Sequence, residues 1–244
     1  MRYAILADIH ANLTAFEAVL ADIGRRGGVD GMWCLGDVVG YGPDPCRCLE
    51  RLRRQGPVVI AGNHDWAAIG KLDTANFNPD AAAACRWTAG QLGPEDRDYL
   101  AGLPPVLTQG DFTLAHGSPR VPLWEYLLSP ASARENLAYF PSRYCLVGHS
   151  HRPLVFRQEA GGAVSRSPFP DGAGLVLGEH RLIINPGGVG QPRDGDPRAS
   201  YAIYDADAGV VRLHRVAYDV GQTQDRMVAA GLPRRLVARL GRGE

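Results

Sequence analysis

The sequence predicts an α/β fold in which two mixed β-sheets pack face to face, with helices on the outside. In the first third of the 244 residues, short apolar runs alternate with segments of helical periodicity, a pattern typical of a parallel sheet. The second half carries closely spaced strand signals, which favour antiparallel pairing. No low-complexity linker divides the chain, so we expect a single domain over residues 1–244.

The elements of the first half follow from periodicity and turn residues. Apolar residues recur three and four positions apart after the first strand, as on the buried face of a helix. Pro94 suits the first turn of a later helix. The predicted strands are Tyr3–Ala7, Met32–Leu35 and Val58–Ala61, and the predicted helices are Leu13–Arg26, about Pro45–Gln55, and two within residues 79–101.

The second half is expected to be mostly strands. They are predicted near Val106–Thr108, Phe112–Ala115, Tyr144–Val147, Leu154–Arg157, Leu175–Leu177, Arg181–Ile184, Ser200–Asp205 and Val210–Val216. The segment Gly161–Gly174 is rich in Gly and Pro and is expected to form a loop. The Arg-rich stretch Arg226–Arg242 has interleaved apolar residues, which indicates a solvated amphipathic helix; a local phosphate-binding patch is the alternative.

Composition excludes several classes of function. There are 26 basic and 26 acidic residues, so net charge does not steer the chain towards nucleic acid or an anionic membrane. No apolar run approaches the roughly 18 residues of a membrane span. We read no signal peptide, and five cysteines argue against a disulfide framework. We therefore expect a cytoplasmic protein; the sequence leaves the oligomeric state open.

Polar clusters follow five of the predicted strands. They are Asp8-Ile9-His10, Gly36-Asp37, Gly62-Asn63-His64-Asp65, His116-Gly117 and Gly148-His149-Ser150-His151. Open α/β sheets bind ligands just beyond the carboxyl ends of their strands. Any one of these histidines alone would more often be structural. Their joint occurrence at five strand ends predicts a metal site.

The charge of the candidate ligands narrows the chemistry. Only Asp8 and Asp37 carry negative charge, so two divalent ions would leave the site net positive, which suits a phosphate ester. Mixed His, Asp and Asn ligation favours manganese, iron, nickel or zinc over calcium or magnesium. We expect two divalent ions, most simply manganese.

Taken together, the five clusters resemble the signature of calcineurin-like metallophosphoesterases. The run Asn185–Gly190 resembles a later block of their small bacterial phosphodiesterase subfamily. The resemblance implies an αββα sandwich and a two-metal hydrolase in which a metal-bridging hydroxide attacks phosphorus in line. It assigns Asp8, His10, Asp37 and His151 to one ion, and Asp37, Asn63, His116 and His149 to the other. It makes His64 a non-ligand that acts on the leaving group, so Asp37 and His64 are the expected catalytic residues.

One departure bears on the substrate. Phosphoprotein phosphatases of this family usually follow the bridging aspartate with a further Asp-Arg-Gly, whereas here the run is Asp37-Val38-Val39-Gly40-Tyr41. The arginine that would grip a phosphate monoester is missing at that place. The possible replacements in substrate binding are Asn12, Tyr41, Asn185 and Arg193. Asn12 could instead cap the following helix, and Arg193 could pair with a nearby Asp.

The expected function is therefore hydrolysis of a small phosphoester, more readily a phosphodiester than a protein monoester. A phosphomonoesterase, such as a protein phosphatase, and a dinucleoside polyphosphate hydrolase are the enzymatic alternatives. A non-catalytic scaffold would be expected to lack ligands, and every ligand position is filled here.

Overall fold

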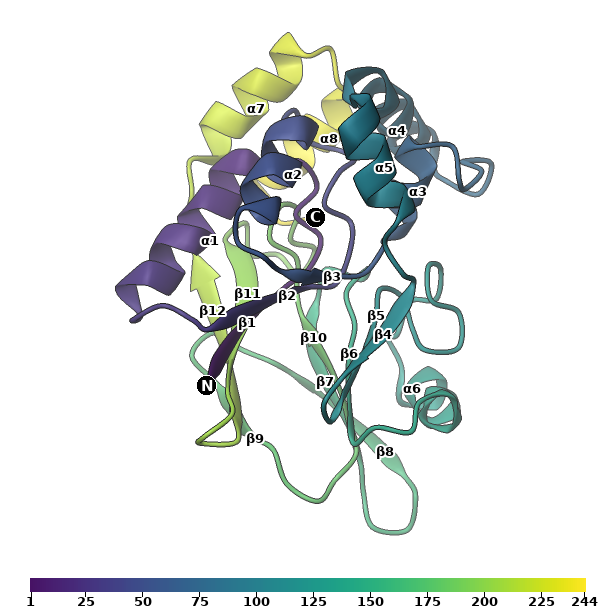
Figure 1. Ribbon diagram of the computed structural model, residues 1–244, viewed down its shortest axis with the longest axis vertical. Coiled ribbons are helices and arrows are strands. Elements are labelled where there is room, and N and C mark those ends of the chain that lie inside the picture. Colours follow the sequence, from purple (N-terminus) through teal and green to yellow (C-terminus); the bar gives the residue numbers. More distant parts are fainter.

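The computed structural model describes residues 1–244 and consists of two six-stranded sheets packed against each other, with helices on their outer faces (Figure 1). The strand order is β3-β2-β1-β11-β12-β9 in the first sheet and β4-β5-β6-β10-β7-β8 in the second. Both sheets mix parallel and antiparallel neighbours, so the predicted αββα sandwich is confirmed.

The first sheet joins the two ends of the chain. Strands β1, β2 and β3 are parallel, and the late strand β11 adds antiparallel to β1. Its strands are β1 (Arg2–Leu6), β2 (Gly31–Cys34), β3 (Val58–Val59), β9 (Gly174–Val176), β11 (Ala199–Asp205) and β12 (Val210–Val216). The β-α-β-α-β run of the first third therefore places three carboxyl strand ends along one edge.

The second sheet has a parallel centre, since β5, β6 and β10 run the same way. Antiparallel strands complete it on both sides. Its strands are β4 (Val106–Gln109), β5 (Phe112–Ala115), β6 (Tyr144–Leu146), β7 (Pro153–Gln158), β8 (Val164–Pro168) and β10 (Leu182–Pro186).

Most helices lie over the first sheet and at the carboxyl ends of its parallel strands, whereas α6 lies against the second sheet (Figure 1). They are α1 (Leu13–Arg25), α2 (Pro45–Arg53), α3 (Asn63–Ala68), α4 (Pro79–Gln91), α5 (Pro94–Ala101), α6 (Pro130–Asn136), α7 (Val220–Ala229) and α8 (Arg234–Leu240), with a 3₁₀ turn at Leu137–Tyr139. None of the helices has both the length and the apolarity needed to cross a lipid bilayer.

Successive side chains of a strand point to opposite faces of its sheet, and this alternation divides the core into layers. Ile5 of β1 faces the second sheet, whereas its neighbours Ala4 and Leu6 face α1 and pack with the fully buried Phe16. In β10, Ile183 likewise points to the α6 side while Leu182 points between the sheets. Burying a side chain such as Phe16 contributes roughly 1.5–3 kcal/mol, so both sheet faces are fixed and the strand ends are held rigidly.

A separate apolar cluster closes the upper end of the molecule. It brings Tyr41, from the loop after β2, together with α4, α7 and α8; its members are Tyr41, Ala81, Ala84, Met227, Leu232, Leu236 and Leu240. The prediction of a single solvated helix for the C-terminal stretch is therefore wrong. It breaks at Gly231-Leu232-Pro233 into α7 and α8, and its apolar side is buried against the loop that carries the site.

One other prediction needs correction. The Gly161–Gly174 segment contains β8, an exposed edge strand that pairs antiparallel with β7, because pairing along a neighbouring backbone can outweigh a loop-like composition. Asp8 and His10 lie beyond the end of β1, and both have positive φ. The short helices α3 and α6 were not predicted from the sequence.

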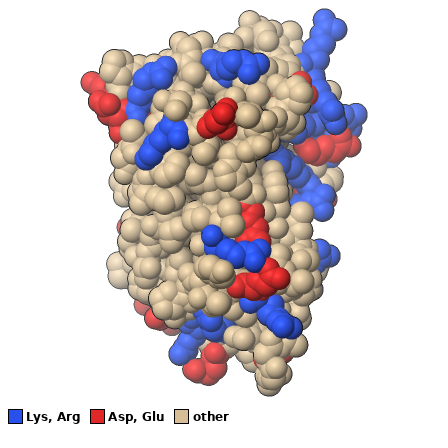
Figure 2. Space-filling model, turned by 90° about the vertical axis from the view of Figure 1, so that its right-hand side faces the viewer, with Lys and Arg blue, Asp and Glu red and all other residues tan.

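Acidic and basic side chains are interspersed on the face shown in Figure 2, without a continuous basic surface. Over the molecule as a whole, charged side chains form ion pairs such as Arg120 with Glu135 and Arg198 with Asp171. This pattern agrees with the balanced net charge.

Candidate metal centre

The candidate centre lies where the parallel strands of both sheets end. Asp8, Asp37 and Asn63 follow β1, β2 and β3 of the first sheet, while His116 and His149 follow β5 and β6 of the second. His10 and His151 lie two residues beyond Asp8 and His149 in the same loops. All seven predicted ligands are buried together, with at most 4 % of any of them exposed.

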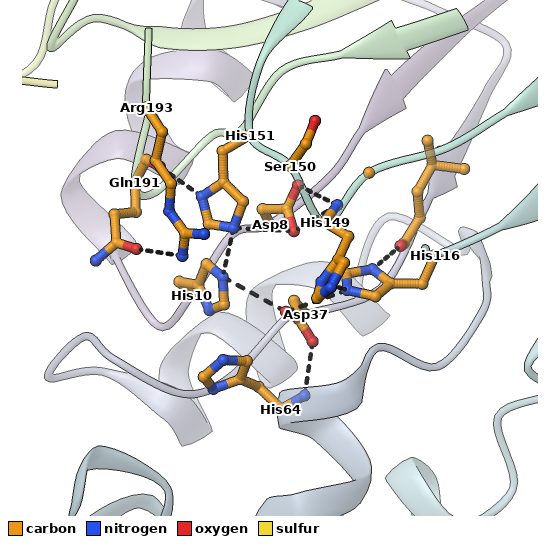
Figure 3. A network of polar contacts seen from close by, with 12 residues as sticks. Asp8, His10, Asp37, His64, His116, His149, Ser150, His151, Gln191 and Arg193 are labelled. Atoms are coloured by element: carbon orange, nitrogen blue, oxygen red, sulfur yellow. Dashed lines mark hydrogen bonds and ion pairs between the residues drawn. The ribbon is translucent and has the colours of Figure 1, made fainter. Parts of the chain in front are cut away.

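Two triads of possible ligands stand side by side in Figure 3. One comprises Asp8, His10 and His151, and in each triad the ligand atoms lie within 4.8 Å of one another. In this triad, His10 Nε2 is 3.2 Å from His151 Nε2, and His151 Nε2 is 3.4 Å from Asp8 Oδ1. Ligands bonded at about 2.0–2.2 Å to one ion stand roughly this far apart.

The second triad comprises Asp37, His116 and His149. His116 Nε2 is 3.2 Å from His149 Nδ1 and 3.1 Å from Asn63 Oδ1, so Asn63 joins this group as predicted. Asp37 connects the two triads, because its Oδ2 is 3.3 Å from His116 Nε2 and 3.5 Å from His10 Nε2. One carboxylate oxygen thus faces ligands of both groups.

Backbone carbonyls hold three of the four imidazoles among the predicted ligands. The Nδ1 atom of His116 is 2.8 Å from the carbonyl oxygen of Leu35, and that of His10 is 3.1 Å from the carbonyl oxygen of Val39. His151 Nδ1 contacts the carbonyl oxygen of Gln191 in the same way. When Nδ1 carries the proton and donates it to a carbonyl, the Nε2 lone pair is free to face a metal.

Strained backbone concentrates at the centre. Seven non-glycine residues have φ in the left-handed region: Asp8, His10, Ala11, Asp37, Tyr41, His149 and His151. Such a conformation costs on the order of 1–3 kcal/mol per residue and persists where the surrounding structure enforces it, typically at functional sites. Five of these residues are predicted ligands, so the folded structure holds these side chains in position at a cost in stability.

Asp65 ties two of the ligand loops together. Its buried carboxylate accepts hydrogen bonds from the backbone N–H of Asp37 (2.8 Å), Val39 (3.1 Å) and Gly62 (2.9 Å). Gly62 is needed for this approach, since a Cβ there would lie 2.0 Å from Asp37 Oδ1. The sequence motif contained Asp65, but only the structure shows that it positions Asp37.

The buried charges at the centre are poorly compensated by other protein groups. Burial raises the pKa of Asp8 to about 7. Burial acts in the same direction on Asp37, but the neighbouring imidazoles, His116 foremost, outweigh it and lower the pKa of that carboxyl. Two buried atoms at the centre, Asp37 Oδ2 and His149 Nε2, form no hydrogen bond. The oxygen and nitrogen donors, their spacing and these unpaired atoms fit divalent transition-metal ions.

His64 stands beside the ligands at the start of α3. Its backbone N–H donates to Asp37 Oδ1 at 2.8 Å, and its Nδ1 lies 3.2 Å from Cys85 Sγ on α4. Burial lowers the pKa of His64 to about 4. Gly40 is required here, because a Cβ would lie 2.6 Å from His64 Nδ1.

A cavity of about 180 Å³ opens next to His64. Aromatic and amide side chains line most of it, together with ligands of the centre. The lining residues are Tyr41, Asn63, His64, Asn76, Phe77, Asn78, Ala81, Trp124, Tyr126 and His149. Tyr126 is 47 % exposed and stacks on His149 with ring centroids 4.0 Å apart, so it stands at the boundary between the centre and solvent.

The four predicted substrate-binding residues divide into two groups. Asn12 and Asn185 are buried and have structural partners. Asn12 caps α1 by accepting from the N–H of Ala15, and its amide donates to the carbonyl of Gly190, so the capping alternative describes its contacts. Asn185 donates to the carbonyl of Gly148, which holds the loop of His149. Neither contacts the cavity.

Tyr41 and Arg193 do lie at the centre. The Tyr41 ring is 4.5 Å from that of His10 and 4.3 Å from that of His64, between centroids. Arg193 forms no ion pair with an Asp, contrary to the alternative considered for it. Its guanidinium instead donates to Gln191 Oε1 at 3.0 Å, beside His151 (Figure 3).

Sequence reasoning did not single out three residues near the centre: Cys85, Gln191 and Arg239. Arg239 does lie in the stretch Arg226–Arg242, for which a local phosphate-binding patch was the alternative. Arg239 of α8 donates to Gln191 Oε1 and lies 4.8 Å from the centroid of the Tyr41 ring. Only the position of Gln191 directly after the Asn185–Gly190 block could have singled it out. Cys85 and Arg239 lie on helices whose docking the sequence does not reveal.

The fold and the paired triads define a metal-dependent phosphoesterase. The family model for the calcineurin-like phosphoesterase superfamily domain matches residues 1–209. The chain therefore belongs to the calcineurin-like phosphoesterase superfamily and is a metal-dependent enzyme that hydrolyses phosphoesters.

Two relatives align with all or nearly all of the chain, and a third aligns with a part of it. The crystal structure of a metallophosphoesterase from Sphaerobacter thermophilus is 50 % identical with a TM-score of 0.91, covering 100 % of this chain and 99 % of that one. An uncharacterized protein of Methanocaldococcus jannaschii is 36 % identical and aligns over 97 % of this chain and 96 % of its own length. A symmetrical bis(5'-nucleosyl)-tetraphosphatase of Pectobacterium carotovorum is 35 % identical over 63 residues, which is 25 % of this chain and 22 % of that protein.

Proposed function

We propose that this enzyme uses two divalent metal ions, manganese being our first expectation, to hydrolyse a small phosphodiester. The observation that supports it best is the position of Asp37, whose Oδ2 faces His10 of one triad and His116 of the other at 3.5 and 3.3 Å. A carboxylate so placed can serve two ions, with the predicted ligands divided between them as the family resemblance implies.

When bound, a pair of divalent ions supplies Lewis-acid chemistry by activating water near neutral pH and neutralising charge on the phosphoryl oxygens. The chain contributes the geometry. Burial of every ligand keeps bulk water from competing, and the carbonyl partners of His10 and His116 fix the rings before substrate arrives.

His64 is proposed to act on the leaving group. Its Nδ1 is directed at Cys85, and no protein group hydrogen-bonds its Nε2. Because His64 lines the cavity, the N–H at Nε2 can donate a hydrogen bond to the departing oxygen of a bound ester and stabilise the charge that develops there. The aromatic rings of Phe77 and Trp124 can hold the organic part of that leaving group.

A preference for diesters is supported by the loop after Asp37. Val38 and Val39 are fully buried in the core, so this loop offers neither a carboxylate to His64 nor an arginine to a monoester. The organic group of a diester that does not leave can instead occupy open space beside Tyr126.

A dinucleoside polyphosphate hydrolase is the second candidate. Two observations favour it: Arg193 and Arg239 bring extra positive charge close to the centre, and the adjoining cavity is lined with aromatic rings suited to stacking on a base. The partial similarity to a symmetrical bis(5'-nucleosyl)-tetraphosphatase agrees with this candidate.

The test is a comparison of kcat/KM on bis-p-nitrophenyl phosphate and p-nitrophenyl phosphate, after chelation and re-addition of manganese. We expect activity to vanish on chelation, to return with metal, and to be greater on the diester. Asp37→Ala purified in parallel measures contaminating phosphatase. A clear monoester preference would reject the diester assignment, and absence of metal-dependent hydrolysis of either compound would reject the two-metal function.

A further inference from the structure

We propose that Arg193, Arg239 and Gln191 form a second anion-binding site beside the metal centre, which binds a second phosphate group linked to the one that is hydrolysed. This inference rests on the proposed function for its substrate, but the site itself is argued from the contacts that Arg193, Arg239 and Gln191 make with one another and with Tyr41.

The two arginines lack the partners that arginines usually have in this protein. Many others pair with carboxylates, including Arg53 with Asp96 and Arg215 with Asp194, but Arg193 and Arg239 form no ion pair. Both are partly buried, where an unpaired charge is costly. Burial and the nearby charge of Arg193 lower the pKa of Arg239, whereas neighbouring groups, Tyr41 foremost, outweigh burial and raise the pKa of Arg193.

The fold nevertheless holds these like charges together. Both guanidinium groups donate to the same atom, Gln191 Oε1, and both lie near the Tyr41 ring, with their Cζ atoms 5.7 and 4.8 Å from its centroid. A pair of arginines held against repulsion by one amide oxygen and one aromatic ring is arranged to receive an anion between them.

Unpaired donors mark the same place. Seven buried side-chain polar atoms in the protein have no hydrogen-bond partner. Two belong to the metal centre, and three belong to this group: Nε of Arg193, Nε of Arg239 and Nε2 of Gln191. All three are hydrogen-bond donors, and leaving buried donors unpaired costs about 1–3 kcal/mol each. An oxyanion supplies the acceptors that they lack.

The proposed anion site lies next to the metal centre. The backbone of Gln191 accepts from His151 Nδ1, and the N–H of Arg193 donates to the carbonyl of His151 at 3.4 Å. Tyr41, which the arginines share, also touches His10 and His64. The anion site therefore adjoins the metal centre closely enough for a group joined directly to the reacting phosphate.

The combined charge of the metal centre and the two arginines indicates which class of ligand they bind. Two divalent ions with Asp8 and Asp37 already leave the centre net positive, and the two arginines add two more positive charges. A simple diester carries only one negative charge, whereas a substrate with two linked phosphates carries at least two. We therefore expect the anion site to favour a diphosphate or longer polyphosphate ester, such as a nucleoside polyphosphate, which is the substrate class of the second candidate function. A diester with one phosphate would use the metal centre alone.

The experiment compares Arg239→Gln with Arg235→Gln, an exposed arginine on the same helix that contacts neither site. With manganese, KM is measured for a dinucleoside tetraphosphate and for bis-p-nitrophenyl phosphate. We expect Arg239→Gln to raise KM for the tetraphosphate about ten- to a hundredfold more than KM for the diester. Arg235→Gln is expected to match the wild type, and Arg239→Lys to recover part of the loss. Equal effects on both substrates would overturn the proposal.

A binding measurement separates this proposal from the proposed function. Calorimetry with imidodiphosphate and with inorganic phosphate needs no turnover. Imidodiphosphate should bind at least about tenfold more weakly to Arg239→Gln than to wild type, with little change for phosphate. Equal weakening of both would indicate a site for free phosphate and reject the linked-phosphate assignment. If the wild type binds imidodiphosphate in this Arg239-dependent way but hydrolyses no ester, the anion site stands and the proposed function falls. Thermal melting of each variant checks folding.

Discussion

Cys85 Sγ lies 3.2 Å from Nδ1 of His64, so a thiol on α4 occupies the place next to the proposed leaving-group histidine. Burial raises the pKa of the Cys85 thiol, which keeps the sulfur protonated. A thiol that donates to Nδ1 leaves the ring proton on Nε2, the nitrogen without a protein partner. The contact therefore has the opposite polarity to one with the carboxylate that the sequence lacks after Asp37, because the thiol donates to Nδ1 where a carboxylate would accept from it.

This contact predicts different effects for two substitutions of Cys85. Cys85→Ala should lower kcat on an alkyl diester about three- to tenfold, as expected for loss of one hydrogen bond. Cys85→Ser, which retains a donor, should keep most of the activity. Steady-state kinetics on alkyl and aryl diesters provide the measurement. Equal losses in both variants would show that only packing at this position matters.

Loss of His64 should reduce catalysis without removing metal. His64→Ala is expected to lower the rate on an alkyl diester by about 10²–10⁴. The loss should be smaller on an activated aryl diester, because p-nitrophenolate needs little stabilisation as it leaves. Rates on both substrates and the metal content of the variant test this. An equal loss on both would contradict a role at the leaving group, and loss of metal would make His64 a structural residue of the centre.

Asp37 and Asp8 should differ in their effects on metal content. Asp37→Ala is expected to lose or weaken both ions, since its carboxylate faces both triads, whereas Asp8→Ala should weaken mainly one. Inductively coupled plasma mass spectrometry after dialysis gives the stoichiometry. Two tightly held ions in Asp37→Ala would remove the bridging role.

Asp65→Ala should destabilise the protein and loosen the centre. Three buried backbone N–H groups would lose their acceptor, including that of Asp37. We expect a loss of roughly 2–5 kcal/mol in the free energy of unfolding, and weaker metal binding. Asp98→Asn, exposed on α5, is the matched control. Urea denaturation with and without manganese measures both effects, and a variant as stable as the control would refute the bracing role.

The pH dependence of stability should change in Asp22→Asn. Burial alone would raise the pKa of Asp22, but hydrogen bonds from Arg26 and Tyr201 outweigh it and lower the pKa. A lowered native pKa gives stability that is present above the unfolded value of about 3.9 and is lost as pH falls through the native value. The variant should be less stable by roughly 1–3 kcal/mol at pH 7. Urea unfolding at pH 7 and pH 3.5 should show this difference shrinking; a constant difference would contradict it.

The sequence by itself determined the parallel strands and the polar residues at their ends. Apolar runs such as the one before Asp8 and the helical repeat in α1 are local patterns, and local patterns predict local structure. Because parallel strands share one edge, the convergence of Asp8, Asp37 and Asn63 followed from chain order. The strand β8 escaped prediction because its composition is that of a loop and only its partner β7 makes it a strand.

Tertiary structure alone decided what surrounds the ligands. Arg239, Cys85 and Gln191 come from a helix near the end of the chain, a helix in its first half and a loop after β10. Nothing in the local sequence of α8 distinguishes Arg239 from the exposed Arg235, since only docking of Leu236 and Leu240 against Tyr41 turns one arginine inward. Side-chain burial and contacts between distant segments arise from packing, which depends on the whole chain rather than on any one segment of it.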